Sequence, residues 1–311
     1  MNRYLSEFLD YCRRKGYASH TIHDYGMTVG AFFAFLRETC PDVTEITDIT
    51  REMVMGYEKH LAVKKDGRGK VMSRNRRRRY LGNLRAFFAY LEKEEKIFQN
   101  PAVNMALPRE KRRLIKDILT PEEMETLLKS CEGTSARGLR DRAIMELLYS
   151  TGIRADELCG IEMGDLDLDE RLLYVRKGKW GNERVVPFGS SAGYWVSRYI
   201  ETARSLLNEE ATDYLFVSLR GTRLEPQTLR RMVKARAGAA GIEKPVTTHT
   251  FRHSCAAHML RGRADIRYVQ KQLGHRRIST TEQYLRVEIT DLKEVHERCH
   301  PREQESWEEE R

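Results

Sequence analysis

Five short segments of this 311-residue chain each place a reactive side chain at a position where a helix boundary or turn is expected. In chain order the segments supply an arginine, a lysine, a histidine with an arginine three residues later, a second histidine and a tyrosine. Each has an ordinary structural interpretation when taken singly, such as a salt bridge to Glu157 or a place in the core. The set consists of Arg154, Lys179, His249, Arg252, His275 and Tyr284.

These six residue types together fit one reaction at a phosphodiester. Two guanidinium groups can hold the non-bridging oxygens and stabilise a pentacoordinate transition state. A tyrosine oxygen can attack phosphorus and form a covalent phosphotyrosine, which preserves the bond energy for a later reversal. A lysine can protonate the departing 5′ oxygen, and a histidine can manage the tyrosine proton. The sequence therefore predicts phosphoryl transfer that needs neither a metal nor a nucleotide cofactor.

The segment HTFRHSCAAHML, residues 249–260, allows an anion site or a metal site. If Thr247 or Thr248 caps a helix, His249 and Arg252 project from one side of its first turn, where helix N-termini hold anions. His249 and His253 are also four residues apart, as zinc ligands on a helix can be. The arginine between them would repel a metal cation, and no general-base carboxylate lies in between. The pattern favours an anion.

The elements that must position these residues can be predicted from local signals. Residues 120–123 are typical of a helix start, with a threonine N-cap, a proline in the first turn and a capping-box glutamate. A further helix is expected over 138–150, and residues from 192 onward have a helical pattern. Gly274 is expected to end a helix just before His275, and Ser279, Thr280 and Thr281 offer caps for a following helix that carries Tyr284.

Residues 172–188, LLYVRKGKWGNERVVPF, predict a β-hairpin. Leu173, Val175 and Val185 show the alternation of strands, and the Lys-Trp-Gly-Asn stretch is expected to form the turn. Lys179 would then lie at the hairpin tip, where a lysine can reach across a cleft.

The N-terminal third has helical periodicity throughout and no strand signal, which predicts a four-helix bundle with helices over 6–16, 21–40, 50–63 and 73–95. The length of the chain predicts two domains. The fold class is mainly α with a small β-hairpin or sheet, in the α+β class. The expected boundaries are a helical N-terminal domain, a basic linker, a second domain that carries the six reactive residues and an acidic tail, at 1–106, 107–119, 120–300 and 301–311.

The positive charge is concentrated near the N-terminus. The net charge is +9, of which residues 1–106 contribute +6 and residues 107–119 contribute +3. Residues 64–79 contain nine basic residues and one acidic residue. Arginines at a helix N-terminus oppose the helix dipole, a cost that a bound polyanion would offset. We expect a phosphate-contacting stripe, although a solvated loop is the simpler alternative. Its members are Lys64, Lys65, Arg68, Lys70, Arg74, Arg76, Arg77, Arg78 and Arg79.

Other features exclude several classes of protein. No apolar run approaches 18 residues and the N-terminus lacks a signal-peptide core, so neither a membrane span nor export is expected. The six cysteines are scattered without a CxxC pair, which favours reduced thiols in a cytoplasm over disulfides or zinc. The expected location is cytoplasmic, in association with the nucleoid.

The segments TGIRADEL, KGKWGNERVVPF, HTFRHSCAAHML and LGHRRISTTEQY, with Asn-Pro-Ala at 100–102, resemble the tyrosine recombinases, the phage integrase family, in their Xer-like form. The resemblance covers nearly the whole chain. It implies a SAM-like core-binding domain and a catalytic domain that together clamp duplex DNA. It also implies roles for the six residues: Arg154 and Arg252 as phosphate clamp, His249 as acid/base, His275 as phosphate contact, Lys179 as general acid and Tyr284 as nucleophile.

The resemblance further implies a site-specific recombinase that works through a Holliday junction. Its partners would be double-stranded DNA carrying recombination sites, and it would act as a homo-tetramer on two sites or as a hetero-tetramer with a second recombinase, with or without accessory proteins. The residues after Tyr284 would dock on a neighbouring protomer or fold back on their own domain. Lys177 is an alternative general acid, and Asp156 stands where many relatives have serine. A type IB topoisomerase and a catalytically silent DNA-binding regulator are the alternative functions.

Overall fold

The computed structural model describes residues 1–65, 69–108, 118–131, 135–176, 183–208, 211–275 and 281. The chain divides into two compact units, Met1–Arg112 and Arg113–Arg311, and each has its own hydrophobic core. None of the helices in these ranges combines the length and the apolar character that crossing a bilayer requires.

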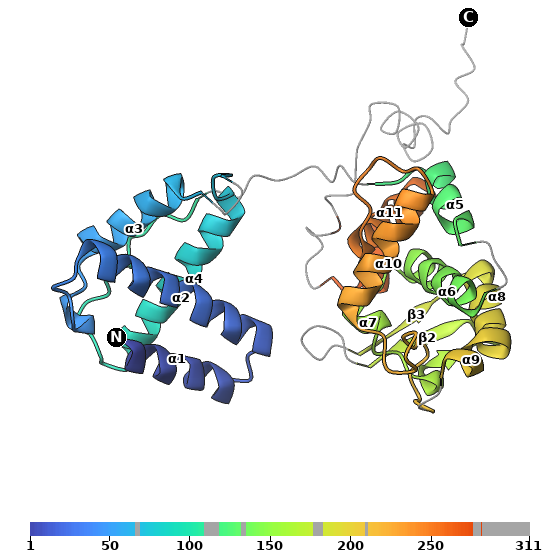
Figure 1. The fold of residues 1–311 in the computed structure, drawn as a ribbon, viewed down its shortest axis with the longest axis horizontal. Helices are drawn as coiled ribbons and strands as arrows, with labels where there is room; N and C mark the ends of the chain where they lie inside the picture. The colour runs from blue at the N-terminus through green and yellow to red at the C-terminus, as the bar shows by residue number, and fades with distance from the viewer. Residues whose placement is uncertain are drawn as a thin grey trace, which may run out of the picture. The chain divides into compact units, whose positions relative to one another are not determined.

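The first unit is the predicted helical bundle (Figure 1). Its helices are α1 (Asn2–Arg14), α2 (Ser19–Thr39), α3 (Arg51–Val63) and α4 (Arg74–Lys93), with a 3₁₀ turn η1 at Ile46–Asp48. Aromatic rings fill the core, because Phe32 contacts Phe88 edge-on at 6.0 Å between centroids and Phe33 contacts Phe87 at 5.8 Å. The apolar stripes of α2 and α4 therefore meet face to face, as their periodicity predicts.

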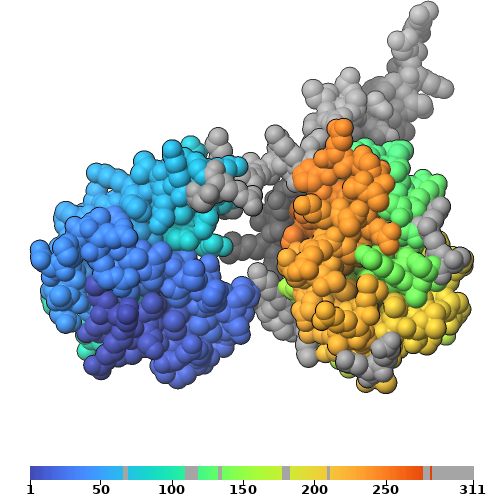
Figure 2. Space-filling view, viewed as in Figure 1, coloured from blue at the N-terminus to red at the C-terminus, as the bar shows by residue number. Residues whose placement is uncertain are grey.

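The second unit surrounds one buried helix with others and a small sheet. Helix α6 (Ala136–Thr151) is buried on most of its surface and packs against α8 (Ser190–Tyr199) and α11 (Thr248–Arg261). In Figure 2 helix α11 and the segment before it, in orange, form part of the surface of this unit. The remaining helical elements are α5 (Pro121–Lys129), α7 (Ala155–Leu158), η2 (Met163–Asp165), η3 (Ile200–Arg204), α9 (Ser205–Leu207), α10 (Pro226–Ala239) and α12 (Ile266–Leu273).

The predicted hairpin is part of a three-stranded antiparallel sheet of β1 (Leu166–Asp167), β2 (Leu172–Val175) and β3 (Arg184–Pro187). The three alternating residues of the prediction do not all share one face. Leu173 pairs with Val186, which is fully buried, whereas Val185 pairs with Tyr174 and is 48% exposed. The register fixes this outcome, since residues directly opposite each other on paired strands share a face. The expected turn at residues 179–182 lies outside the described residues.

Three helix ends follow the sequence signals. Thr120 caps α5 through its hydroxyl oxygen and the Glu123 carboxylate completes the capping box. Gly152 ends α6 and Gly274 ends α12, both in the left-handed conformation with φ of 63° and 66°. The segment 212–225, expected to be helical, instead holds isolated bridges such as Val217 with Arg223. Short bridges of this kind lack a periodic pattern and so leave no sequence signal.

We expect Gly152→Ala to destabilise the protein more than Gly241→Ala. Both glycines have a left-handed backbone, which costs about 1–2 kcal/mol for a residue with a Cβ. A Cβ at Gly152 would also lie 2.6 Å from Leu273 Cδ2, whereas nothing lies within 4 Å of one at Gly241. Urea unfolding should therefore show an additional loss of about 1–3 kcal/mol for Gly152→Ala. Equal losses in the two variants would contradict the close approach of Leu273 to the backbone at Gly152.

Candidate active site

The N-terminus of α11 presents His249 and Arg252 as the sequence predicts. Thr247 is the N-cap, and its hydroxyl accepts a hydrogen bond from the Thr250 backbone N–H at 3.3 Å. His249 lies exposed in the first turn of the helix, and its ring stacks beside His253 with 6.2 Å between centroids. Arg252 lies one turn further on and is only 4% exposed.

Arg252 is anchored by the carboxyl ends of two helices. Its Nη1 donates to the Gly152 carbonyl at 2.7 Å and its Nη2 donates to the Leu273 carbonyl at 2.6 Å. These carbonyls end α6 and α12, where backbone acceptors lack helical partners and the helix dipole is negative. The two helix ends therefore stabilise a cation that burial alone would disfavour.

Arg154 is the N-cap of α7, and its side chain reaches the turn that ends α12. Its Nη2 donates to the Gly274 carbonyl at 3.4 Å, and its Nη1 donates to Glu157 Oε1 at 2.9 Å. Arg154 and Arg252 thus bond consecutive carbonyls, those of Gly274 and Leu273. The salt bridge to Glu157, which the sequence offered as an alternative to a phosphate clamp, is present in addition to this convergence.

His275 follows directly on this turn. Its Nδ1 lies 2.9 Å from Thr281 Oγ1. Burial, followed by the charges of Arg252 and Arg154, lowers the pKa of His275 to about 3. Partial desolvation and the same two arginines lower the pKa of His249. Both imidazoles are therefore neutral near pH 7, so each can donate one hydrogen bond and accept another.

Glu157 and Arg184 support the site, and Arg184 has no role in the sequence analysis. Glu157 is almost fully buried, and Arg184 from β3 bonds its two oxygens at 2.8 and 3.1 Å. Burial opposes the ionisation of Glu157, but hydrogen bonds from Arg184 and from the Arg154 backbone N–H, with the charges of both arginines, lower its pKa to about 2. The Glu-Arg pair at 183–184 was visible as part of a motif, but nothing local indicated its partner.

The structure brings together four of the six predicted residues: Arg154, His249, Arg252 and His275. Lys179, its alternative Lys177 and Tyr284 lie outside the described residues. Across the described ranges, no group of three or more His, Cys, Asp or Glu side chains is arranged to hold a metal ion. The four residues form a cluster of two cations and two neutral imidazoles, a setting that suits an oxyanion rather than a metal.

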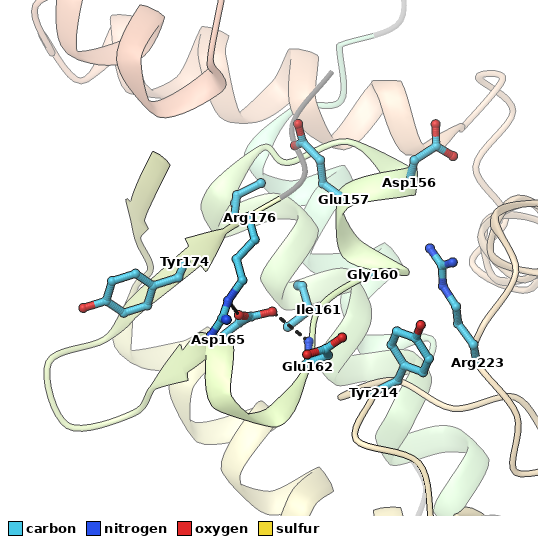
Figure 3. Close-up of a pocket in the computed structure, with 11 residues that line it drawn as sticks. Asp156, Glu157, Gly160, Ile161, Glu162, Asp165, Tyr174, Arg176, Tyr214 and Arg223 are labelled. Carbon is cyan, nitrogen blue, oxygen red and sulfur yellow. Dashed lines mark hydrogen bonds and ion pairs between the residues drawn. The ribbon is translucent and has the colours of Figure 1, made fainter. Parts of the chain in front are cut away.

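Asp156 lies in the first turn of α7 and is exposed. It lines a pocket together with Arg223, Tyr214 and Glu162 (Figure 3). Arg223 itself donates to the Cys159 carbonyl at 2.9 Å and lies over the Tyr214 ring. The charge of Asp156 raises the pKa of His249, against the larger effects that lower it.

The basic stripe is described except for Arg68. Ser73 caps α4, and its hydroxyl accepts from the Arg76 N–H at 3.3 Å. Arg74, Arg76 and Arg79 are exposed, as are Lys64, Lys65 and Lys70. Arg77 and Arg78 are half-buried, and Arg78 donates to the Pro108 carbonyl at 3.0 Å. The exposed cations of the stripe are therefore accessible to a phosphate backbone, whereas Arg78 is also bonded within its own unit.

The comparisons with known proteins identify the family. Residues 117–290 match the phage integrase family, and residues 5–95 match the phage integrase N-terminal SAM-like domain. The chain belongs to the phage integrase family of tyrosine recombinases. This confirms the family, the enzyme class and the fold class that the motifs predict.

The similarity to curated tyrosine recombinases extends along nearly the whole chain. Tyrosine recombinase XerC 2 of Ralstonia nicotianae is 35% identical over 97% of this chain and 86% of its own length. Tyrosine recombinase XerD of Halalkalibacterium halodurans is also 35% identical, over 97% of this chain and 99% of its own. The fold is similar to that of a lambda integrase tetramer bound to a Holliday junction, with a TM-score of 0.70 at 20% identity over 91% of this chain and 76% of that one.

The lowered pKa of His275 predicts how stability depends on pH. The folded pKa of about 3 lies below the ordinary value of 6.5, so the unfolded chain binds a proton that the folded chain does not. The free energy of unfolding should therefore fall as pH decreases from about 6.5 toward 3. In His275→Asn this fall should be smaller. Chemical denaturation between pH 7.5 and 5 would test the difference. Glu157 does not disturb this range, because it affects the pH dependence of stability only below its ordinary pKa of 4.5. Parallel curves for the two proteins would contradict the buried neutral imidazole.

The exposed arginines of α4 predict the salt dependence of DNA binding. Log affinity falls by about 0.9 per unit of log salt concentration for each phosphate neutralised. Arg74→Gln with Arg76→Gln should therefore lower the slope by about 1.8. Arg13→Gln with Arg37→Gln is a matched control, because these arginines lie in the last turns of α1 and α2, where they complement the helix dipole. Fluorescence anisotropy over a salt series measures both slopes. If the two double variants gave the same slope of log affinity against log salt concentration, the stripe would not contact DNA phosphates.

Proposed function

We propose that this chain is a site-specific recombinase that cleaves and rejoins duplex DNA through a covalent 3′-phosphotyrosine. Each active protomer would cut one strand, leave a free 5′ hydroxyl and pass the strand to a partner through a Holliday junction. The observation that carries the proposal is the convergence of Arg154 and Arg252 on two consecutive carbonyls, with His275 directly after them.

The two arginines would bind the scissile phosphate. Their guanidiniums are fixed in place by carbonyl groups and Glu157 before any substrate arrives. Groups that are already oriented stabilise the charge of a transition state without the cost of reorganisation. A planar guanidinium also suits two oxygens of one phosphoryl group. The site would therefore bind the pentacoordinate state more tightly than the ground-state diester.

The proton transfers follow from the remaining residues. The Tyr284 oxygen forms a bond to phosphorus while the bond to the 5′ oxygen breaks. His249, neutral and exposed, would accept the tyrosine proton, and Lys179 would supply a proton to the departing 5′ oxygen. His275, held by Thr281, would hydrogen bond a non-bridging oxygen. Reversal with a different 5′ hydroxyl as nucleophile joins the strand to its new partner.

The domain plan assigns the remaining functions. The bundle at 1–106 would contact the DNA backbone through the exposed cations of the stripe, and the linker at 107–119 would join it to the catalytic domain at 120–300 around the duplex. The working assembly would be a tetramer, as the lambda integrase bound to a Holliday junction is. The residues after Tyr284 would dock on a neighbouring protomer and end in the acidic tail at 301–311.

A nicked suicide substrate tests the proposal. On duplexes taken from the flanking DNA, the wild type should form a covalent protein–DNA adduct in EDTA that survives a denaturing gel. Tyr284→Phe should abolish the adduct, because no oxygen remains to attack phosphorus. Tyr268→Phe is the matched control, since this tyrosine of α12 is 69% exposed and has no assigned role.

The outcomes separate the alternatives. An adduct that persists in Tyr284→Phe would overturn the assignment of the nucleophile. A wild type that binds the duplex but forms no adduct, alone or with an extract that supplies a partner recombinase, would favour the silent DNA-binding regulator. Supercoil relaxation by the monomer without strand exchange would favour the topoisomerase.

A further inference from the structure

Arg184 is the first residue of β3, five positions after Lys179 in the predicted hairpin tip. Resting on the proposed function, we propose that Arg184 is a positioning residue that sets the geometry of the phosphate clamp without contacting the phosphate. It would act by holding Glu157, which orients Arg154, and by holding the turn that precedes His275.

The first connection runs through Glu157. Arg184 bonds both carboxylate oxygens, at 2.8 and 3.1 Å, while Arg154 bonds the same carboxylate through Nη1 and through its backbone N–H, both at 2.9 Å. The Glu157 side chain is only 2% exposed, so no solvent competes for its oxygens. Four N–H groups fix one buried carboxylate. Any movement of Arg184 would therefore change where Arg154 is held.

The second connection runs through the end of α12. The carbonyls of Gln272, Leu273 and Gly274 accept hydrogen bonds from Arg184 Nε at 3.3 Å, Arg252 Nη2 at 2.6 Å and Arg154 Nη2 at 3.4 Å. Three arginines from three separate elements thus satisfy three consecutive carbonyls that a helix end leaves without partners. A Cβ at Gly274 would lie 3.0 Å from Arg184 Nε, so the guanidinium packs directly on the backbone there.

The same contacts argue against a role as a third phosphate ligand. Both terminal nitrogens of Arg184 bond Glu157, and its side chain is only 13% exposed. The side chain of Arg154 is 27% exposed, so it is the more accessible member of the pair. Without Arg184, the buried carboxylate would keep Arg154 as its nearest cation and draw it away from substrate.

Arg176 supplies a matched control. It flanks the hairpin at the end of β2 and forms an ion pair with Asp165, whose side chain is 5% exposed. Figure 3 shows Arg176 extending toward Asp165 and away from Glu157. Arg176→Met therefore removes the same charge and uncovers a buried carboxylate, but touches none of the carbonyls that end α12.

The test compares Arg184→Met with Arg176→Met on three suicide duplexes. One has an ordinary scissile phosphate. The second has a neutral methylphosphonate there, which carries less charge for the clamp to stabilise. The third has a 5′-bridging phosphorothiolate, whose thiolate leaves without a proton from a general acid. Adduct formation is measured under single-turnover conditions, and the wild-type adduct on the ordinary phosphate establishes independently that the proposed function holds.

We expect Arg184→Met to slow cleavage of the ordinary phosphate by about 10²-fold, the size of effect that a misplaced catalytic group produces. The loss of rate relative to wild type should be smaller on the methylphosphonate, which has less charge to stabilise, and unchanged on the phosphorothiolate, which bypasses only the general acid. Arg176→Met should cleave all three duplexes at close to the wild-type rate. Arg184→Lys keeps the charge but cannot bond both oxygens of Glu157 with two fixed nitrogens, so it should show the same pattern. Because it leaves the buried carboxylate paired with a cation, it tests positioning even if Arg184→Met unfolds at a lower temperature than Arg176→Met.

Two results would overturn the proposal. Equal cleavage by Arg184→Lys and wild type would show that the clamp does not depend on this residue. The second is a cleavage rate of Arg184→Met that returns to the wild-type rate on the phosphorothiolate but not on the methylphosphonate. Because the phosphorothiolate needs no general acid, this result would show that Arg184 positions the lysine of the hairpin instead of the arginine clamp.

Discussion

The catalytic unit depends on one interaction: cations bound by the carboxyl ends of helices. Arg154 and Arg184 both bond Glu157 Oε1, at 2.9 and 3.1 Å, so these nitrogens lie at most about 6 Å apart. At that separation two unit charges repel by about 3 kcal/mol at an effective dielectric constant of about 20. The carbonyls that end α12 and the carboxylate of Glu157 offset this repulsion. Without them the guanidiniums would separate.

The same arrangement sets the protonation of the histidines. A cluster of fixed cations disfavours a further positive charge, and burial adds to the effect at His275. The arginines that the proposed function assigns to the phosphate therefore also keep the imidazole of His275 neutral, a state in which it can both donate and accept a hydrogen bond. Asp156 opposes this effect at His249. The protonation states of His249 and His275 thus depend on residues far away in the sequence.

Local signals predicted the parts of the fold that local physics determines. The caps at Thr120, Thr247 and Gly274 were predictable because each depends on a few adjacent residues. Val185 does not share a face with Leu173 and Val175, because the register of paired strands depends on the length of the turn between them. The partners of Arg184 lie 27 and 88 positions away, and no local pattern indicates such contacts. The resemblance to a family predicts which residues react, but it did not indicate that Arg184 holds Glu157 and the end of α12.

The burial of α6 has a consequence for motion. This helix is covered by α8 and α11, and its last turn provides the Gly152 carbonyl that binds Arg252. Backbone amides in such a helix exchange with solvent hydrogen only when the unit opens as a whole, whereas exposed loops exchange through local fluctuations. One anchor of the arginine clamp therefore belongs to the slowest-exchanging part of the unit. Loosening that anchor should therefore cost much more free energy than opening an exposed loop, so we expect Arg252 to keep its place while loops of the same unit fluctuate.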